Sequence, residues 1–334
     1  MARLPKDAAW SISDYKFASP SSMIVTGATG MICAHFVHHI LTTTNCQAHC
    51  IGISATDDLD AHRKVMENLP RWGLASSIPN KAYDRLTTHR DHIADSIFQF
   101  DSDVSLLKNY EDVYADNVGL HFLIGLARSP VPGNVKAFNQ LSTWGVPHLQ
   151  TRSTTQLLSS GYLTGEEETT NMKRGAESTL GYLECRWVCE LLLYEAGRGG
   201  LPINIYRSCI VGTNASSHQG LDRTNINRRI VESALQTGLV PDFDSARGCG
   251  MSWIELDFLV KRIAFLPSRE NSKNAAKVFN LVSDQHIKYD EFACVLGQSY
   301  NGEKVRVLQL ELWAQAFRAS NNYGDARRGS PVAT

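Results

Sequence analysis

The chain has 334 residues, of which 43% are hydrophobic and 20% charged, and its formal net charge is −1. This balance is typical of an ordinary globular protein, and the lack of a basic surplus argues against nucleic acid or an anionic membrane as a partner. The longest apolar runs are far shorter than the roughly 20 residues that a bilayer requires, and the first residues lack the apolar core of a signal peptide, so we expect a cytoplasmic protein without a membrane span.

Strand-like and helix-like segments alternate along the chain after residue 20. In chain order, the pattern predicts a leader over 1–20, a strand over 21–26, a helix over 31–43, a strand over 47–54, a helix over 57–74, a strand over 95–100, a helix over 105–129, a strand over 135–143, a helix over 179–200, a strand over 201–212, helices over 224–238 and 255–266, a strand over 277–282 and a helix over 286–300. Such alternation is typical of a parallel sheet with helices on both faces. We therefore expect an α/β protein with a Rossmann-like, doubly wound parallel sheet.

The domain organisation follows from where this alternation weakens. The Rossmann-like domain is expected over 21–213, and later segments at about 251–285 are expected to return to it. A smaller, mainly helical C-terminal cap is expected over 214–318. The polar stretch over 319–334 contains Gly and Pro and predicts a disordered tail.

A glycine-rich turn joins the first predicted strand to the first predicted helix. Gly27 permits a tight turn, and Gly30 lets backbone N–H groups approach a pyrophosphate at the positive end of the helix. Cys33 stands where a third glycine would let the helix pack closely on the strand. Together with Thr29 and Met31, these residues form a degenerate dinucleotide site, although a purely structural turn would have the same residues.

The end of the second predicted strand lacks the expected group for a ribose. An acid there would bind the ribose hydroxyls of NAD, and a base would bind the 2′-phosphate of NADP, but Ser54 is neither. Asp57 and Asp58 follow it and would either serve NAD or cap the next helix.

Two further segments carry side chains suited to handling a carbonyl group. Tyr182 and Arg186 are four residues apart and share a helix face, where the cation would make the phenol proton more labile. Ser142 and Thr143 end a predicted strand, and hydroxyls at such a strand end can donate to an oxyanion. His148 lies a few residues further on and is a candidate base. The structural alternatives are a surface Tyr–Arg contact and a turn stabilised by the two hydroxyls.

Histidines and cysteines gather near the start of the chain. Cys46, His49 and Cys50 lack a second cluster at zinc-like spacing, so we predict no metal site and interpret the cysteines as small buried apolar residues. Three histidines with helical spacing are interpreted as a partly solvated helix face, in preference to a catalytic or metal-binding group; they are His35, His38 and His39.

The order and content of these segments resemble the terminal thioester reductase domains of nonribosomal peptide synthetases and hybrid polyketide–peptide synthetases. Those domains belong to the extended short-chain dehydrogenase/reductases. The similar stretches cover most of residues 22–270 in the same order. They are IVTGATGMICAHFVHHIL, DSDVSLLKNYEDVYADNVG, VKAFNQLSTWGV, GYLECRWVCELLL, GLPINIYRSCIVG and INRRIVESALQTGLVPDF.

The resemblance implies a function and a set of partners. Such domains bind NADPH and reduce a thioester on a phosphopantetheinyl carrier protein, which releases an aldehyde or an alcohol. The resemblance places catalytic positions at Thr143 and Tyr182, with Arg186 where the family has lysine.

The departures from the family all fall on the cofactor. Cys33 replaces the third glycine, the arginine that holds the 2′-phosphate is absent around Ser54, and Arg186 replaces the lysine. The stretch over 75–94 also lacks the Gly-Asp-Leu segment that flanks the adenine in the family. We therefore expect the cofactor to be none or vestigial, and to be NADPH if the site is functional.

The predicted reaction is redox-independent release of a carrier-bound polyketide or peptide thioester by Dieckmann-type cyclisation to a tetramic acid. That reaction needs a base and oxyanion donors but no hydride. Thr143 and Tyr182 are the predicted donors, Arg186 adds positive charge, and His148 and Asp257 are candidate bases. The alternatives are an NADPH-dependent thioester reductase and a non-catalytic docking module for a carrier protein. A free-standing chain and the C-terminal domain of a synthetase would look alike in sequence.

Overall fold

The structure is a computed structural model, and it divides into two compact units. The larger unit includes the described residues before 220 and those within 254–282. The smaller unit includes the described residues within 220–253 and 283–334. The described residues are 21–52, 55–90, 112–115, 120, 123–124, 127, 137–146, 181–212, 226–242, 251–265, 276–281, 286–299, 305–309, 312–313 and 315–316. The predicted leader, the predicted tail and the predicted strand over 95–100 lie outside them.

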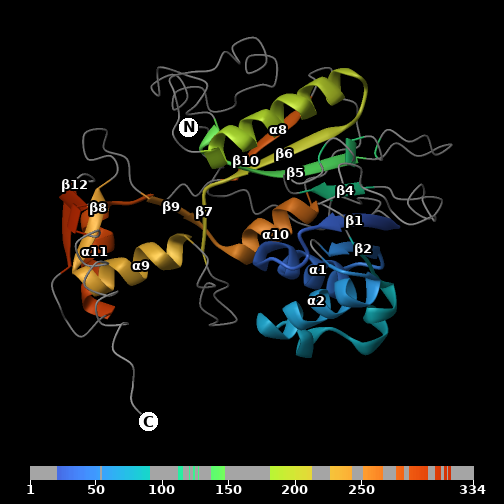
Figure 1. Cartoon of the computed structure of the whole chain (residues 1–334), viewed down its shortest axis with the longest axis horizontal. Helices are drawn as coiled ribbons and strands as arrows, with labels where there is room; N and C mark the ends of the chain where they lie inside the picture. Colours follow the sequence, from blue (N-terminus) through green and yellow to red (C-terminus); the bar gives the residue numbers. More distant parts are fainter. Residues whose placement is uncertain are drawn as a thin grey trace, which may run out of the picture. The chain divides into compact units, whose positions relative to one another are not determined.

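The larger unit is built on a parallel sheet. Among the described residues its seven strands have the order β10-β6-β5-β4-β1-β2-β3, and every neighbouring pair is parallel (Figure 1). The strands are β1 (Ser22–Thr26), β2 (Gln47–Gly52), β3 (Leu86–Arg90), β4 (Asp112–Ala115), β5 (Ala137–Thr143), β6 (Ile203–Ser208) and β10 (Lys277–Leu281). Strand order reverses at β1 and β4, as in a doubly wound dinucleotide-binding fold. The predicted α/β class is confirmed.

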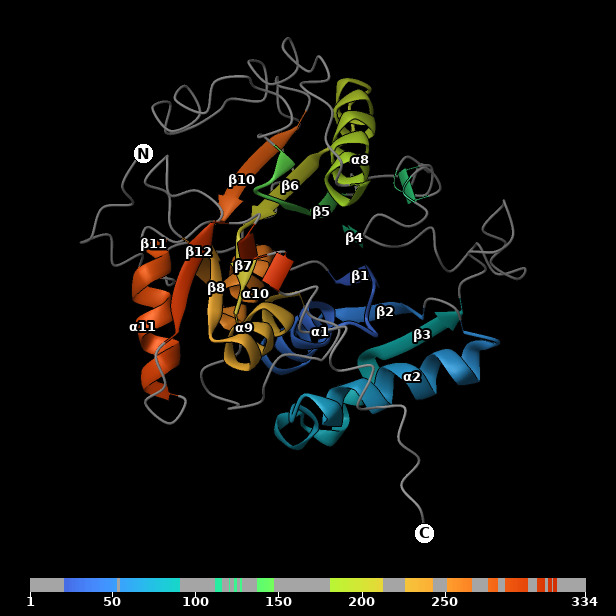
Figure 2. The same ribbon diagram turned by 60° about the vertical axis from the view of Figure 1, so that its left-hand side comes forward.

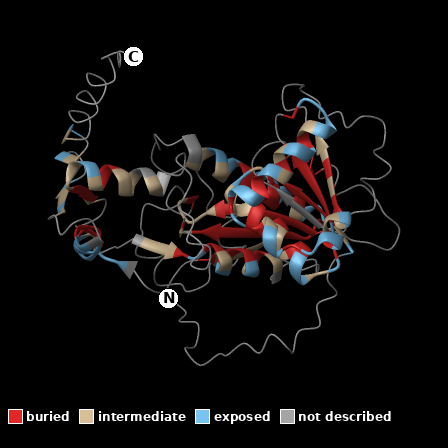
Figure 3. Ribbon diagram, turned by 90° about the horizontal axis from the view of Figure 1, so that it is seen from below, coloured by how far each residue is buried: buried red, intermediate tan, exposed pale blue. Residues whose placement is uncertain are grey.

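Helices cover both faces of this sheet. Residues of α1 (Met31–Thr43), α2 (Asp58–Arg71) and α10 (Leu256–Phe265) share one buried cluster with strand residues such as Val25 and Cys50. The next residues along those strands, Ile24 and Ile51, belong to a second cluster with α8 (Gly181–Arg198). Because successive strand residues point to opposite faces, the two clusters lie on the two sides of the sheet. The strands of this sheet are mostly coloured as buried in Figure 3.

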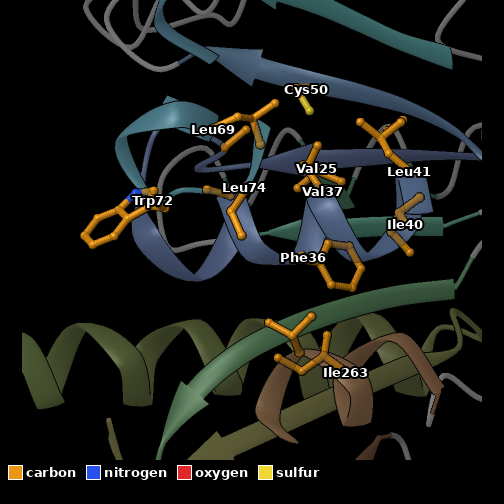
Figure 4. Close-up of a cluster of buried hydrophobic side chains, with 14 of the residues drawn as sticks. Val25, Phe36, Val37, Ile40, Leu41, Cys50, Leu69, Trp72, Leu74 and Ile263 are labelled. Atoms are coloured by element: carbon orange, nitrogen blue, oxygen red, sulfur yellow. The ribbon is translucent and has the colours of Figure 1, made fainter. Parts of the chain in front are cut away.

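The first of these clusters fixes the helices that follow the glycine turn. In Figure 4, Phe36 of α1 points toward Ile263 of α10, while Val25 and Cys50 lie on the strands behind α1. All four side chains are at most 6% exposed. Burial of such apolar side chains is the main stabilising term, at about 25 cal/mol per Å² removed from water.

Most predicted elements of the larger unit agree with the described structure, but three strand assignments differ there. The helix predicted over 105–129 is wrong at 112–115, because this segment is β4, hydrogen-bonded between β1 and β5. The predicted strand over 201–212 is interrupted at Cys209, whose N–H donates to the carbonyl oxygen of Leu281, so that β7 (Ile210–Val211) follows β6 separately. The edge strand β3 was not predicted. Its residues are mostly polar, and within the described part of the chain it pairs with β2.

The smaller unit combines two helices with short strands. The described elements are α9 (Ile226–Thr237), β8 (Leu239–Asp242), β9 (Met251–Ile254), β11 (His286–Ile287), α11 (Tyr289–Ser299) and β12 (Arg306–Gln309). Here β8, β9, β11 and β12 were not predicted as strands. β8 pairs with β12 in parallel orientation (Figure 2). β9 pairs with β11 in antiparallel orientation. The rings of Trp253 and Phe292 pack within it at 6.1 Å between centroids. In the described part of the whole chain, no helix is both long and apolar enough to cross a bilayer.

Candidate functional site

The glycine turn has the backbone geometry that its sequence predicts. Gly27 has φ of +71°, a conformation that favours glycine, and the N–H of Gly30 donates to its carbonyl oxygen at 2.8 Å. This turn carries Thr29 and leads into α1 at Met31. It lies at the carboxyl end of β1, where the strand order reverses and ligands bind in such folds.

The start of α1 is suited to an anion. Its N-cap is Gly30, which provides no side-chain cap, and the described first turn contains no acidic residue. The first N–H groups of a helix have no partner within the helix and carry a partial positive charge. The turn and the helix start therefore fit the pyrophosphate of a dinucleotide.

A buried side chain from α2 holds the glycine turn in place. Asn68 donates from Nδ2 to the carbonyl oxygens of Ala28 and Gly30, at 2.9 and 3.2 Å. Its own Oδ1 accepts from Nε1 of Trp72 at 2.9 Å. The Gly30 carbonyl oxygen also accepts from the N–H of Ala34 at 3.0 Å, so Asn68 links the turn and the start of α1 to α2. Sequence reasoning missed this residue, and its one signal was an amide on the apolar face of a predicted helix.

Cys33 is a half-buried cysteine that packs against the cluster beneath α1. A Cβ atom placed on Gly27 would lie 3.5 Å from the Cys33 Sγ, so the sulfur lies beside the turn. Burial, and secondarily the neighbouring Cys33, raise the pKa of the Cys50 thiol on β2. The Cys33 side chain thus fills the space that a third glycine would leave between helix and strand.

The aspartates after β2 have structural partners. Asp57 caps α2 by accepting from the N–H of Asp60 at 2.7 Å, and Asp58 accepts from the N–H of Arg90 at 2.8 Å. The Arg90 guanidinium donates from Nη1 to the carbonyl oxygen of Thr56 at 3.0 Å. A positively charged side chain therefore reaches the β2–α2 connection from the end of β3. Ser54 lies outside the described residues.

The second part of the site lies where β5 and β6 meet α8. Ser142 donates to the Glu190 carboxylate at 2.5 Å. Arg207 of β6 contacts the same carboxylate through Nε at 3.1 and 3.2 Å and through Nη2 at 2.5 Å. Glu190 and Arg207 are completely buried. The Ser142 hydroxyl is thus directed at a buried carboxylate beneath the strand ends.

Arg186 also contacts β5, one turn of α8 closer to Tyr182. Its Nη1 donates to the carbonyl oxygen of Leu141 at 2.6 Å. Two residues on, the Thr143 hydroxyl accepts from the N–H of Gly145 at 3.3 Å, and Thr143 is half-buried. A permanent positive charge therefore lies beside the strand that carries Thr143.

The first turn of α8 packs against the loop after Thr143. A Cβ atom placed on Gly145 would lie 2.5 Å from Cδ2 of Leu183, so any larger residue there would require the Leu183 side chain to shift. Leu183 follows Tyr182, and the contact brings the backbone of Tyr182 to the end of β5. The Tyr182 side chain and all of His148 lie outside the described residues.

Asp257 lies on α10, the helix packed against α1. Burial is the main cause that lowers the pKa values of the three predicted histidines on α1, and the Asp257 charge partly opposes it. His35 is buried with Nδ1 2.9 Å from the Met31 carbonyl oxygen, and His38 Nε2 lies 2.7 Å from the Ser77 hydroxyl. The described structure thus associates Asp257 with the histidines of α1.

The residues near β2 that resembled metal ligands each have other contacts in the structure. Cys46 is buried and donates from Sγ to the Gln47 carbonyl oxygen at 3.5 Å. His49 stacks on His89, with 3.3 Å between Nδ1 and Nε2. Burial, followed by the charge of His89, lowers the pKa of His49 to about 4. Across the described ranges, no group of three or more His, Cys, Asp or Glu side chains is placed to hold a metal ion.

Comparisons with known proteins connect this geometry to a family. The profile of an NAD-binding family described as Male sterility protein matches residues 77–263. The chain is 26% identical over 339 residues to the hybrid PKS-NRPS synthetase pynA of Aspergillus niger, an alignment that covers 90% of this chain. The chain spans only 8% of the length of that relative.

Two solved structures share the fold. The terminal R domain from the myxalamid PKS-NRPS biosynthetic pathway gives a TM-score of 0.72 at 20% identity, over 92% of this chain and 77% of that one. A thiolation-reductase di-domain from an archaeal nonribosomal peptide synthetase gives 0.65 at 14% identity, over 90% of this chain and 63% of that one. These findings confirm the resemblance drawn from the sequence.

Proposed function

Since the chain belongs to the Male sterility protein family and has the fold of synthetase reductase domains, we propose that it releases a polyketide or peptide chain from a carrier protein. The relative of Aspergillus niger is a hybrid PKS-NRPS synthetase, and one structural neighbour joins its reductase to a thiolation domain. The proposed substrate is therefore an acyl or peptidyl thioester on a phosphopantetheinyl arm.

The proposed reaction is Dieckmann-type cyclisation without a hydride. A base removes the acidic proton between the two carbonyl groups of a β-ketoamide. The resulting carbanion attacks the thioester carbonyl carbon, a C–C bond forms, the C–S bond breaks, and the carrier thiol leaves with a proton. The ring that closes in this way is a tetramic acid. No oxidant or reductant is consumed, because the electrons of the new C–C bond come from the substrate carbanion.

The observation that carries this proposal is the hydrogen bond from Arg186 to the Leu141 carbonyl oxygen. In a hydride-transferring relative, a lysine at this position would hold the cofactor ribose with a compact ammonium group. A planar guanidinium directed at the main chain of β5 is poorly suited to that role. It does supply positive charge beside Thr143, where the enolate and tetrahedral oxyanions of a cyclisation need it.

The remaining roles follow from the same positions. Thr143 and Tyr182 are proposed to donate hydrogen bonds to the developing oxyanions, because the end of β5 and the first turn of α8 lie together. His148 and Asp257 stay the candidate bases for the acidic C–H. Replacing each by glutamine or asparagine and measuring the pH dependence of release would separate them.

The test is an assay of the purified chain with a carrier-bound β-ketoamide thioester. In buffer free of nicotinamide nucleotides, mass spectrometry should detect a cyclised product at a rate that NADPH leaves unchanged. Release that depends on NADPH, with an aldehyde or alcohol as the product, would favour the second candidate below.

The second candidate is an NADPH-dependent thioester reductase, and it is favoured by the other half of the site. The glycine turn and the start of α1 fit a pyrophosphate, and Arg90 provides a base at the strand edge where a 2′-phosphate would lie. The dinucleotide would supply a hydride to the thioester carbonyl. Gly27, Gly30 and Arg90 would hold and orient it. Saturable NADPH binding that Arg90→Met weakens would support this candidate.

A further inference from the structure

The contact between α8 and the sheet contains a buried ion pair. The side chains of Glu190 and Arg207 have no exposed surface, and Arg207 contacts both carboxylate oxygens. Ser142 donates to the same carboxylate and is 4% exposed. Ser142 and Arg207 are direct partners in the parallel ladder between β5 and β6. One carboxylate on the helix therefore joins two neighbouring strands near their carboxyl ends.

Stability alone is a weak reason for a chain to contain such a pair. Removing two charges from water is unfavourable, and the mutual attraction of buried ions often no more than offsets it. Proteins in which apolar side chains of similar volume replace such a pair are often equally stable or more stable. The pair does, however, impose one arrangement on the strands and the helix, because a fork of donors and a carboxylate meet well in a limited set of orientations.

The residues that the pair holds are those of the candidate site. Thr143 follows Ser142 on β5, and Arg186 lies one turn before Glu190 on α8. The turn that contains Tyr182 lies one further turn toward the start of the same helix. A small rotation or slide of α8 would therefore change the position of Tyr182 and Arg186 relative to Thr143 together.

We propose that Glu190 and Arg207 are positioning residues, which fix α8 against the ends of β5 and β6 so that Thr143, Tyr182 and Arg186 converge on one carbonyl group. The inference rests on the proposed function of this site, and it applies to cyclisation and to reduction alike. Ser142 is the link from the pair to β5 and acts through Glu190.

The test replaces the three polar side chains by apolar ones, so that an effect on the stability of the fold can be separated from an effect on the position of α8. The triple variant Ser142→Ala, Glu190→Met, Arg207→Met removes all three polar groups, so no buried charge is left without a partner. The control is Glu195→Met with Arg198→Met, which removes an exposed ion pair at the other end of the same helix. Urea unfolding measures the stability of both, and single-turnover release measures their activity.

The expected result is a triple variant as stable as wild type with release slowed by about 100-fold, since misplacement of catalytic groups by about 1 Å has effects of that size. KM should change by about twofold or less, because the effect falls on the transition state. Hydrogen exchange at the amides of Trp144 and Gly145, which bond to Ser208 and Thr143, should be faster. The control variant should match wild type in every measurement.

A stable triple variant with wild-type release and wild-type exchange at Trp144 and Gly145 would overturn the inference. Ser142→Ala alone keeps the ion pair and serves if the triple variant does not fold. It should slow release and speed exchange at the same two amides, and unchanged values of both would equally overturn the inference. If wild type releases nothing under any condition, the proposed function fails, while the exchange measurement still tests the positioning role.

Discussion

Arg186 donates a hydrogen bond of 2.6 Å from Nη1 to the carbonyl oxygen of Leu141, and this contact joins α8 to β5 two residues before Thr143. A lysine with its amine at the same point would present a mobile point charge, whereas the guanidinium is planar and held by the strand. A fixed positive charge therefore lies beside the strand that carries Thr143, and the glycine turn still fits a pyrophosphate.

The first prediction concerns that charge. Arg186→Met should slow release by about 100-fold, the effect of removing one group that stabilises an oxyanion. Arg198→Met, an exposed arginine at the end of the same helix, is the matched control and should leave the rate unchanged. Single-turnover release measures both. Equal rates for wild type and Arg186→Met would show that the guanidinium is structural.

The second prediction concerns the close approach of α8 to the loop after Thr143. An alanine at Gly145 would place its Cβ 2.5 Å from Leu183 Cδ2, so Gly145→Ala should force the Leu183 side chain to shift and disturb its packing in the first turn of α8, next to Tyr182. We expect release to slow by about 10-fold and the free energy of unfolding to fall by about 1–3 kcal/mol. Leu183→Ala in the same chain should restore much of both. A double variant no better than Gly145→Ala would contradict this account.

The third prediction concerns the side chain that holds the glycine turn. Asn68→Asp replaces the amide donor to Ala28 and Gly30 by a carboxylate, so these carbonyl groups would face an acceptor. We expect a loss of about 2–4 kcal/mol in the free energy of unfolding, measured by urea denaturation. Asn80→Asp, an exposed amide-to-acid change, should alter stability by less than about 0.5 kcal/mol. Similar losses in the two variants would refute the role of Asn68.

The fourth prediction concerns the pH dependence of stability. The pKa of His49 falls from 6.5 to about 4 in the folded chain, chiefly through burial. Between these values the unfolded chain binds the proton and the folded chain does not, so stability falls as pH decreases from about 6.5 to about 4. The contribution of His49 is on the order of 3 kcal/mol and becomes constant below pH 4.

His49→Asn should remove this part of the pH dependence, which urea unfolding at several pH values will measure. His62→Asn is the control, because His62 is exposed on the neighbouring helix α2. If wild type and His49→Asn lose stability in parallel between pH 6.5 and 4, burial of His49 has no such effect.

The sequence predicted the parts of the fold that depend on local patterns. Gly27 and Gly30 after an apolar strand indicated the turn, and the regular apolar spacing after Gly181 indicated α8. β4 was missed because four residues in a helix-like stretch become a strand by pairing with β1 and β5, and such pairing depends on distant segments.

The site was predicted in outline, and its polar contacts were not. Arg207 and Glu190 stand within apolar segments of β6 and α8, and sequence spacing does not reveal that they meet across 17 residues. Asn68 likewise bonds to a turn about 40 residues away. Ser142 was predicted as a donor to substrate, and its partner in the structure is Glu190. These contacts arise from tertiary packing between segments distant in the sequence, so the local spacing of residues does not predict them.

The most direct test of redox-independent release is the isotopic composition of the product. The carrier-bound β-ketoamide is incubated with the chain and NADPH that carries deuterium at the transferable position, and the released product is analysed by mass spectrometry. The account predicts a cyclised product without deuterium and no consumption of the nucleotide. A released aldehyde or alcohol that contains deuterium would contradict it and identify the chain as a reductase.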